Sequence, residues 1–141
     1  MMTHMLVLLL LAAVAHSQPA RPPLRERAAN GDADAQFTLG KNYEAGRGGL
    51  KKDYAEAARW YSKSAEQGNV YAQASLGILY HAGKGVAQDN VQAEMWFLIA
   101  ADRSPAGDRD TILEMRDSVA AHLTPRQKAE AQRLAHEWKA K

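Results

Sequence analysis

Apolar and small side chains recur along this chain at the spacing of amphipathic helices. In one segment they lie four residues apart, at Ala35, Leu39 and Tyr43. In the next segment, one helical face carries Ala57, Trp60, Tyr61 and Ser64. The two segments together predict a pair of helices joined by a short loop.

The same helix pair occurs twice. Residues 28–64 align with residues 65–100, and nine positions recur after an interval of 37 residues. The first members are Gly31, Ala35, Gln36, Leu39, Gly40, Tyr43, Ala45, Gly46 and Gly48, and their counterparts are Gly68, Ala72, Gln73, Leu76, Gly77, Tyr80, Ala82, Gly83 and Gly85. Beyond one deletion the interval becomes 36 residues, which pairs Asp53 with Asp89, Trp60 with Trp96, and Tyr61 with Phe97. A period of this length predicts an all-α solenoid, because each helix pair needs a neighbour to bury its apolar face.

Glycine and aspartate mark the predicted helix ends. Gly46 and Gly83 stand where the first helix of each pair must stop, because glycine adopts the left-handed conformation that closes a helix without steric cost. The second helix is predicted to begin at Asp53 and at Asp89. A Glu or Gln follows each aspartate three residues later, which is the pattern of a capping box.

Gly40 and Gly77 fall inside the first helix of each pair, where glycine costs about 1 kcal/mol relative to alanine. Its recurrence at the same place indicates a close approach of the paired helix. We expect the missing side chain to make room for an aromatic ring, that of Trp60 or Trp96.

The repeated unit resembles the Sel-like repeat (SLR), a relative of the tetratricopeptide repeat. The resemblance is carried by Ala35-Gln36-Phe37-Thr38-Leu39-Gly40, Tyr43, Gly46-x-Gly48, Asp53-Tyr54-x-Glu56-Ala57-Ala58-x-Trp60-Tyr61 and Ala65-Glu66-Gln67-Gly68. It implies an α-solenoid of antiparallel helix pairs, with two full repeats over residues 28–64 and 65–100. The second copy departs at Ala74, Asn90 and Glu94 but keeps the glycines, the aspartate and the tryptophan.

The flanking segments are expected to cap the solenoid. Residues 18–27 form a proline-rich leader and a short cap, and residues 101–141 form a degenerate helix pair. The first helix of that pair is predicted over residues 108–123. The second starts at Thr124, followed by Pro125 and Gln127, which is the pattern of a helix N-terminus.

The N-terminus has the features of a signal peptide. The apolar run over residues 6–15 is too short to span a bilayer, and it contains the cleavage signal Ala13-Val14-Ala15. We therefore expect residues 1–17 to be removed and the protein to be exported, either to the bacterial periplasm or out of the cell. No membrane insertion is expected after cleavage.

Composition and motifs argue against nucleic-acid binding, catalysis and metal binding. The net charge is only +2, which does not indicate a nucleic-acid binder, and the absence of cysteine excludes disulfides, thiolate nucleophiles and iron-sulfur clusters. No serine lies in a nucleophile motif, so we predict no catalytic residue and no cofactor. We predict no metal site either, since His81, His122 and His136 are separated by 41 and 14 residues.

In tetratricopeptide-like solenoids the first helix of each pair lines the concave side. The positions there that packing does not require are predicted to bind a protein or peptide partner: Asp34, Thr38, Lys41, Asn42, Tyr71, Ser75, Ile78 and His81. Ile78 and Leu79 make the second repeat more apolar than the first, unless they pack against the C-terminal helices. A cluster of loop cations, Arg47, Lys51, Lys52 and Lys84, leaves an anionic partner open as an alternative.

The resulting hypothesis is a non-enzymatic adaptor of the bacterial envelope, either monomeric or weakly self-associating. The resemblance to SLR proteins implies such adaptor roles. Two alternatives stay open at this point. One is a cell-wall or β-lactam-binding or hydrolysing SLR protein, and the other is a structural homo-oligomer.

Overall fold

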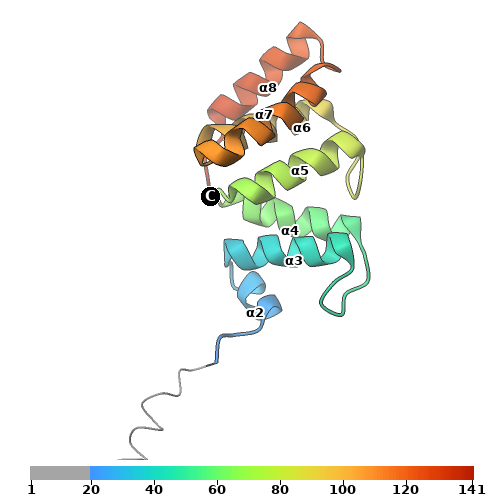
Figure 1. The fold of residues 1–141 in the computed structure, drawn as a ribbon, viewed down its shortest axis with the longest axis vertical. Helices are drawn as coiled ribbons and strands as arrows, with labels where there is room; N and C mark the ends of the chain where they lie inside the picture. The colour runs from blue at the N-terminus through green and yellow to red at the C-terminus, as the bar shows by residue number, and fades with distance from the viewer. Residues whose placement is uncertain (1–19) are drawn as a thin grey trace, which may run out of the picture.

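The computed structural model describes residues 20–141, and the signal peptide expected over residues 1–17 lies outside them. The described part contains helices and no strand. In chain order the helices are α2 (Leu24–Ala29), α3 (Ala33–Ala45), α4 (Tyr54–Glu66), α5 (Val70–Ala82), α6 (Asn90–Arg103), α7 (Ala106–Ala120) and α8 (Pro125–Glu137). They stack one above another along the long axis of the molecule (Figure 1). The expected all-α solenoid is confirmed.

Each repeat is an antiparallel helix pair, α3 with α4 and α5 with α6, and α4 packs against α5 to join the two. The first helix of each pair ends at Gly46 or Gly83, with φ of 66° and 67°, in the left-handed conformation that the sequence predicts. These helices also have side-chain N-caps that the sequence analysis did not assign. Asp32 accepts a hydrogen bond from the backbone of Ala35, and Asn69 caps α5 in the same way.

The second helices begin as predicted, but without capping boxes. The Asp53 and Asp89 side chains accept hydrogen bonds from the backbone N–H groups three residues later. The predicted return hydrogen bond, from the backbone N–H of each aspartate to the Glu56 or Gln92 side chain, is wrong. The backbone N–H of Asp53 donates to the carbonyl of Tyr43 at 2.9 Å instead, and that of Asp89 donates to the carbonyl of Tyr80. Glu56 pairs with a neighbouring arginine instead. A full capping box is present at the start of α8, where the sequence placed it.

Gly40 and Gly77 do lie against aromatic rings of the paired helix, but the rings belong to other residues than expected. A Cβ at Gly40 would lie 2.6 Å from the ring of Tyr61, and one at Gly77 would lie 3.1 Å from the ring of Phe97. Trp60 instead packs against α2 and α3, and Trp96 lies edge-on to Trp138 at 6.1 Å between ring centroids.

Buried glutamines join each repeat to the helix before it. Gln36 donates to the carbonyl of Ala28 in α2, and Gln73 donates to the carbonyl of Ala65 in α4, both at 3.1 Å. Each amide side chain adds a donor to a carbonyl at a helix C-terminus, which also accepts from the backbone N–H of Gly31 or Gly68. The short helix α2 therefore contacts the first repeat in the way that α4 contacts the second.

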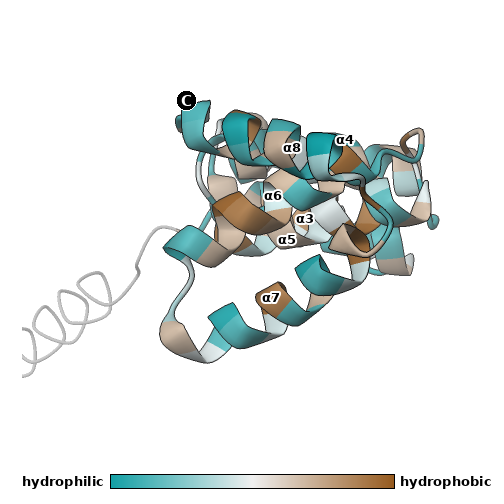
Figure 2. Cartoon of the chain, turned by 90° about the horizontal axis from the view of Figure 1, so that it is seen from above, coloured by the Kyte–Doolittle hydropathy of each residue, from teal (hydrophilic) through white to brown (hydrophobic). Residues whose placement is uncertain are grey.

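The two last helices pack mainly against α6 rather than against each other. They lie on opposite sides of the central helices when the molecule is viewed along its axis (Figure 2). Helix α7 begins two residues before the predicted start. An ion pair holds it to α6, since Arg116 Nε lies 2.8 Å from an oxygen of the wholly buried Glu94. None of the described helices is both long and apolar enough to cross a bilayer.

Candidate partner-binding groove

A shallow apolar groove of about 280 Å³ lies between α5 and α7. Helix α3 contributes one side chain to it, α5 contributes four and α7 contributes four. They are Phe37, Tyr71, Ala74, Ser75, Ile78, Asp108, Thr111, Ile112 and Met115. The groove exists because α7 packs on α6 and leaves part of the exposed face of α5 uncovered.

Tyr71 and Ile78 are the large apolar residues that stay exposed in the described part of the chain, at 49% and 43%. Their neighbour Leu79 is 1% exposed and belongs to the main core. The sequence left open whether Ile78 and Leu79 pack against other helices or stay exposed, and the answer differs between the two residues. Leu79 is a packing residue, whereas Ile78 faces solvent in the groove.

Aromatic rings continue from the core into the groove. The ring of Phe37 lies 5.8 Å from that of Tyr61 and 6.1 Å from that of Tyr71. The ammonium group of Lys41 lies 5.4 Å from the Phe37 ring centroid, within the range of a cation–π contact. These contacts place a positive charge at the α3 end of the groove.

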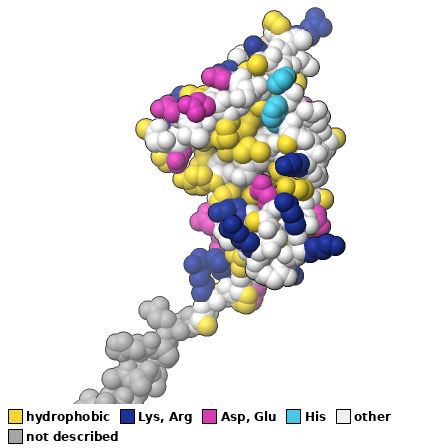
Figure 3. Space-filling view, turned by 45° about the vertical axis from the view of Figure 1, so that its right-hand side comes forward, with side chains coloured by type: hydrophobic (Ala, Val, Ile, Leu, Met, Phe, Trp, Pro, Cys, Tyr) yellow, Lys and Arg dark blue, Asp and Glu magenta, His cyan; other side chains and the backbone are white. Residues whose placement is uncertain are grey.

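A hydrogen bond spans the other end of the groove. The Tyr71 hydroxyl donates to the carboxylate of Asp108 at 2.9 Å, which connects α5 to α7. This bond, with the negative charge of Asp108, raises the pKa of the Tyr71 phenol. The groove is therefore bounded by a cation on α3 and by a carboxylate on α7. On this face, apolar side chains gather between acidic groups and basic groups (Figure 3).

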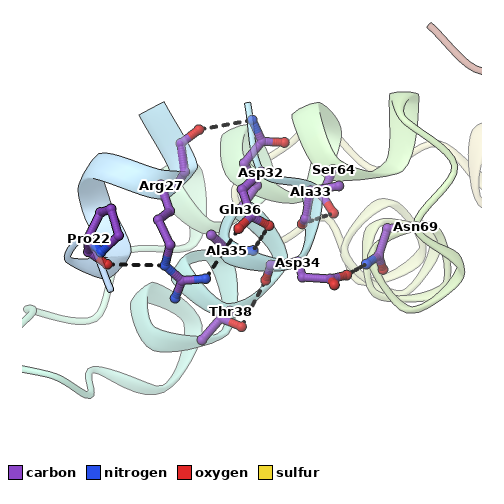
Figure 4. Close-up of polar contacts among 11 residues, drawn as sticks. Pro22, Arg27, Asp32, Ala33, Asp34, Ala35, Gln36, Thr38, Ser64 and Asn69 are labelled. Atoms are coloured by element: carbon purple, nitrogen blue, oxygen red, sulfur yellow. Dashed lines mark hydrogen bonds and ion pairs between the residues drawn. The ribbon is translucent and has the colours of Figure 1, made fainter. Parts of the chain in front are cut away.

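Three of the eight residues predicted to bind a partner line the groove: Tyr71, Ser75 and Ile78. Lys41 does not line the groove itself, but its ammonium group contacts the ring of Phe37, which does. Asp34 and Thr38 are not among its lining residues. Asp34 accepts a hydrogen bond from Asn69, and Thr38 donates to the backbone carbonyl of Asp34 (Figure 4).

The other two predicted residues also lie outside the lining of the groove. Asn42 is partly buried beside Gly48. His81 contacts Asn90 and His122.

The sequence analysis missed Phe37 and the four residues of α7. Phe37 occupies the position at which the second repeat has Ala74, and that difference in size is a signal that could have been used. No comparable signal marked α7, because it does not follow the repeat pattern.

The loop cations form a separate basic edge. Lys52 and Lys84, one from each interhelical loop, lie 5.0 Å and 5.2 Å from the ring centroid of Tyr54. The stacking of repeats brings the two loops together, as expected. The neighbouring ammonium of Lys52, assisted by that of Lys84, lowers the pKa of the Tyr54 phenol.

Comparisons with known proteins agree with this architecture. The chain matches a protein-family model described as Sel1 repeat over residues 33–69 and 70–105, which together cover just over half of it. Among solved structures, it is similar to c5321, described as a protective antigen present in uropathogenic Escherichia coli strains and displaying an SLR fold. The two share 39% sequence identity with a TM-score of 0.75, over 82% of this chain and 24% of that one.

Two other relatives cover less of the chain. A Sel1 repeat protein from Oxalobacter formigenes is 33% identical with a TM-score of 0.59, over 65% of this chain and 26% of that one. The ERAD-associated E3 ubiquitin-protein ligase component HRD3A from Arabidopsis thaliana is 32% identical over 62 residues, which are 44% of this chain and 9% of the plant protein. The chain therefore spans only a small part of the proteins that it matches.

Proposed function

The chain belongs to the Sel1 repeat family, whose members are generally non-catalytic protein-interaction modules, and from this premise we propose that it binds a short segment of a partner protein in the groove between α5 and α7. The observation that carries the proposal is that Tyr71 and Ile78, two turns apart on one face of α5, both stay exposed in the same groove. Large apolar side chains that share a concave site and stay exposed are typical of surfaces that another molecule covers.

The groove offers a modest amount of binding energy. Full burial of a large apolar side chain contributes about 1.5 to 3 kcal/mol, so covering the exposed part of Tyr71 or Ile78 contributes about 1 kcal/mol each. The buried Ile112 and the partly buried Met115 provide an apolar floor that needs no rearrangement. A segment with two or three apolar side chains fits such a surface.

The charges at the two ends of the groove restrict the partner further. Asp108 favours a Lys or Arg of the partner near α7, and Lys41 favours an Asp or Glu near α3. The proposed ligand is therefore a peptide segment with apolar side chains between a basic and an acidic residue. This charge order also sets the direction in which the segment binds.

We place this interaction outside the cytoplasm, as part of the same proposal. The support is the apolar run over residues 6–15 and the small residues at the expected cleavage site. The partner would then be another protein of the bacterial envelope or a secreted protein, and the chain would act as an adaptor.

A phage-displayed peptide library selected against the immobilised full chain tests the proposal. Selected peptides are expected to carry apolar residues between a basic and an acidic residue. Their affinity, measured by fluorescence anisotropy, should fall about fivefold in Tyr71→Ala, because about 1 kcal/mol corresponds to a factor of about five. It should fall further in Ile78→Asp, because a carboxylate would then be covered by apolar groups of the peptide.

The matched control is Ala129→Asp, which adds the same charge as Ile78→Asp at an exposed position of α8 that does not line the groove. The control should bind as the unchanged chain does. Peptides that bind equally well to Ile78→Asp would refute the groove assignment. A molecular mass of two or more chains in light scattering, lost in Ile78→Asp, would instead indicate that a second copy of the chain covers this surface.

A further inference from the structure

The fold brings together two histidines that lie 41 residues apart in the sequence. His81 is in the last turn of α5, and His122 is in the turn between α7 and α8. Their ring centroids are 5.7 Å apart, with an angle of 37° between the ring planes. Adjacent histidine side chains reach the surface next to the apolar patch in Figure 3.

A hydrogen bond determines which nitrogen of His81 is free. The Nδ1 atom of His81 lies 2.8 Å from Oδ1 of Asn90, the first residue of α6. An amide oxygen can only accept, so Nδ1 carries the hydrogen and the lone pair of the neutral ring is on Nε2. Histidines that bind metal ions are commonly held in this way, through a hydrogen bond from the nitrogen that does not contact the metal.

We propose that His81 and His122 together bind one divalent transition-metal ion, such as Zn²⁺, Ni²⁺ or Cu²⁺. Two imidazoles on one ion, with metal–nitrogen distances of about 2.0 to 2.1 Å, place their ring centres about 5 to 6 Å apart. The observed separation of 5.7 Å lies within this range. Imidazole nitrogen prefers these ions to Mg²⁺ or Ca²⁺, which take oxygen ligands.

Water supplies the remaining ligands in this proposal. Within residues 20–141, no group of three or more His, Cys, Asp or Glu side chains is placed to share a metal ion. A polar cleft of about 260 Å³ adjoins His122, and its lining includes Gln88, Asp89 and Gln127. The cleft has room for water molecules on the exposed side of the ion.

The proposed ion would add a connection between α5 and the turn that follows α7. It joins the end of α5 to the turn after α7, whereas Tyr71 and Asp108 join the other ends of the same two helices. Metal binding therefore stabilises the folded chain, because the unfolded chain does not hold the two imidazoles together.

The test uses the full chain without an affinity tag, titrated with ZnCl₂ and, as a control, with MgCl₂. Calorimetry should show one Zn²⁺ per chain, and Tm should rise by about 5 °C or more at a saturating concentration of Zn²⁺. Mg²⁺ should change neither quantity. An unchanged Tm, together with no heat of Zn²⁺ binding, overturns the proposal.

Matched variants identify the ligands. His122→Gln should lose Zn²⁺ binding while it keeps the helical spectrum, since His122 is exposed, and His81→Gln should lose it as well. A variant with His4, His16 and His136 all changed to Gln retains only the proposed pair and should bind as the unchanged chain does.

Asn90→Ala should weaken binding by about 10- to 100-fold, because the ring of His81 is then no longer oriented. Zn²⁺ binding that persists in His122→Gln, or that disappears in the triple variant, assigns the metal to other histidines and contradicts the proposal.

Discussion

Gly40 is the position at which the pairing of α3 with α4 can be tested most directly. A Cβ there would lie 2.6 Å from Cδ1 and 2.7 Å from Cε1 of Tyr61, whereas non-bonded carbon atoms pack at about 3.5 to 4.0 Å. The Tyr61 ring is 1% exposed, and its hydroxyl donates to the carboxylate of Glu44. An alanine at position 40 therefore requires the ring or the helix to move by roughly 0.9 Å.

Two effects oppose each other in Gly40→Ala. Alanine is better than glycine in a helix interior by about 1 kcal/mol. Adding atoms to a well-packed core costs about 1 to 3 kcal/mol. We expect the overlap to dominate and the free energy of unfolding to fall by about 1 kcal/mol, since Tyr61 is held at both its ring and its hydroxyl. Gly40→Leu must displace the ring altogether and should cost about 3 to 5 kcal/mol.

Gly77 provides the matched comparison. Its Cβ would lie 3.1 Å from the ring of Phe97, so the required shift is only roughly 0.4 Å. Gly77→Ala should therefore change the free energy of unfolding by less than about 0.5 kcal/mol, because the helix propensity of alanine offsets the smaller overlap. Gly107 in α7 has no atom within 4 Å of a Cβ, and Gly107→Ala should be neutral or stabilising.

Urea denaturation followed by far-UV circular dichroism measures these differences, and each kcal/mol corresponds to a change in Tm of about 4 °C for a chain of this size. The reasoning is refuted if Gly40→Ala is as stable as the unchanged chain. It is refuted equally if Gly77→Ala costs more than Gly40→Ala.

Two further predictions follow from buried and capping charges. Arg116→Met leaves the fully buried carboxylate of Glu94 without its cation, so the free energy of unfolding measured in urea should fall by about 2 to 4 kcal/mol. Adding Glu94→Ala should recover more than half of that loss. A double variant no more stable than Arg116→Met would contradict the pairing. The hydrogen bond from Ala35, together with Arg27, holds the pKa of Asp32 below its ordinary value of 3.8, so its contribution to stability is present above that pH and is lost as the pH falls through the lower, folded-state pKa. Asp32→Asn should therefore reduce the loss of stability on acidification from about pH 5 to pH 3, and an unchanged acid profile would contradict this assignment.

The repeat pattern predicted the helices well because their ends depend on local chemistry. Gly46 and Gly83 end helices through their own backbone conformation, and Asp53 and Asp89 begin helices through contacts three residues away. Such signals require no knowledge of the neighbouring helix. The same holds for Thr124 at the start of α8.

Contacts between helices were harder to predict. Trp60 and Tyr61 differ by only 100° around α4, and the orientation of the facing helix decides which of them meets Gly40. The capping boxes failed for a similar reason, because the carbonyl of Tyr43 reaches the backbone of Asp53 from another helix. Periodicity shows which residues share a face but not which partners they meet.

The candidate site shows the same division. Tyr71, Ser75 and Ile78 were predicted because they lie on the exposed face of a repeated helix, whereas the α7 side of the groove was missed. The proximity of His81 to His122 was likewise not evident, because a separation of 41 residues gives no metal-binding spacing. Both omissions arise where the chain leaves its repeat.

The features that distinguish this chain from a plain pair of repeats therefore depend on α7 and the turn after it, which follow the matched repeats. The repeats build the scaffold and one wall of the groove, and α7 completes the groove with Asp108 and Met115. Helix α7 packs on α6 through Ile112 and Val119, and it is also paired with Glu94, a buried carboxylate in α6 at the position where the first repeat has Ala58. A carboxylate buried in an apolar interface is costly unless a cation meets it, so Glu94 selects the arrangement in which Arg116 reaches it. This departure from the repeat pattern thus helps to position the helix on which both proposed sites depend.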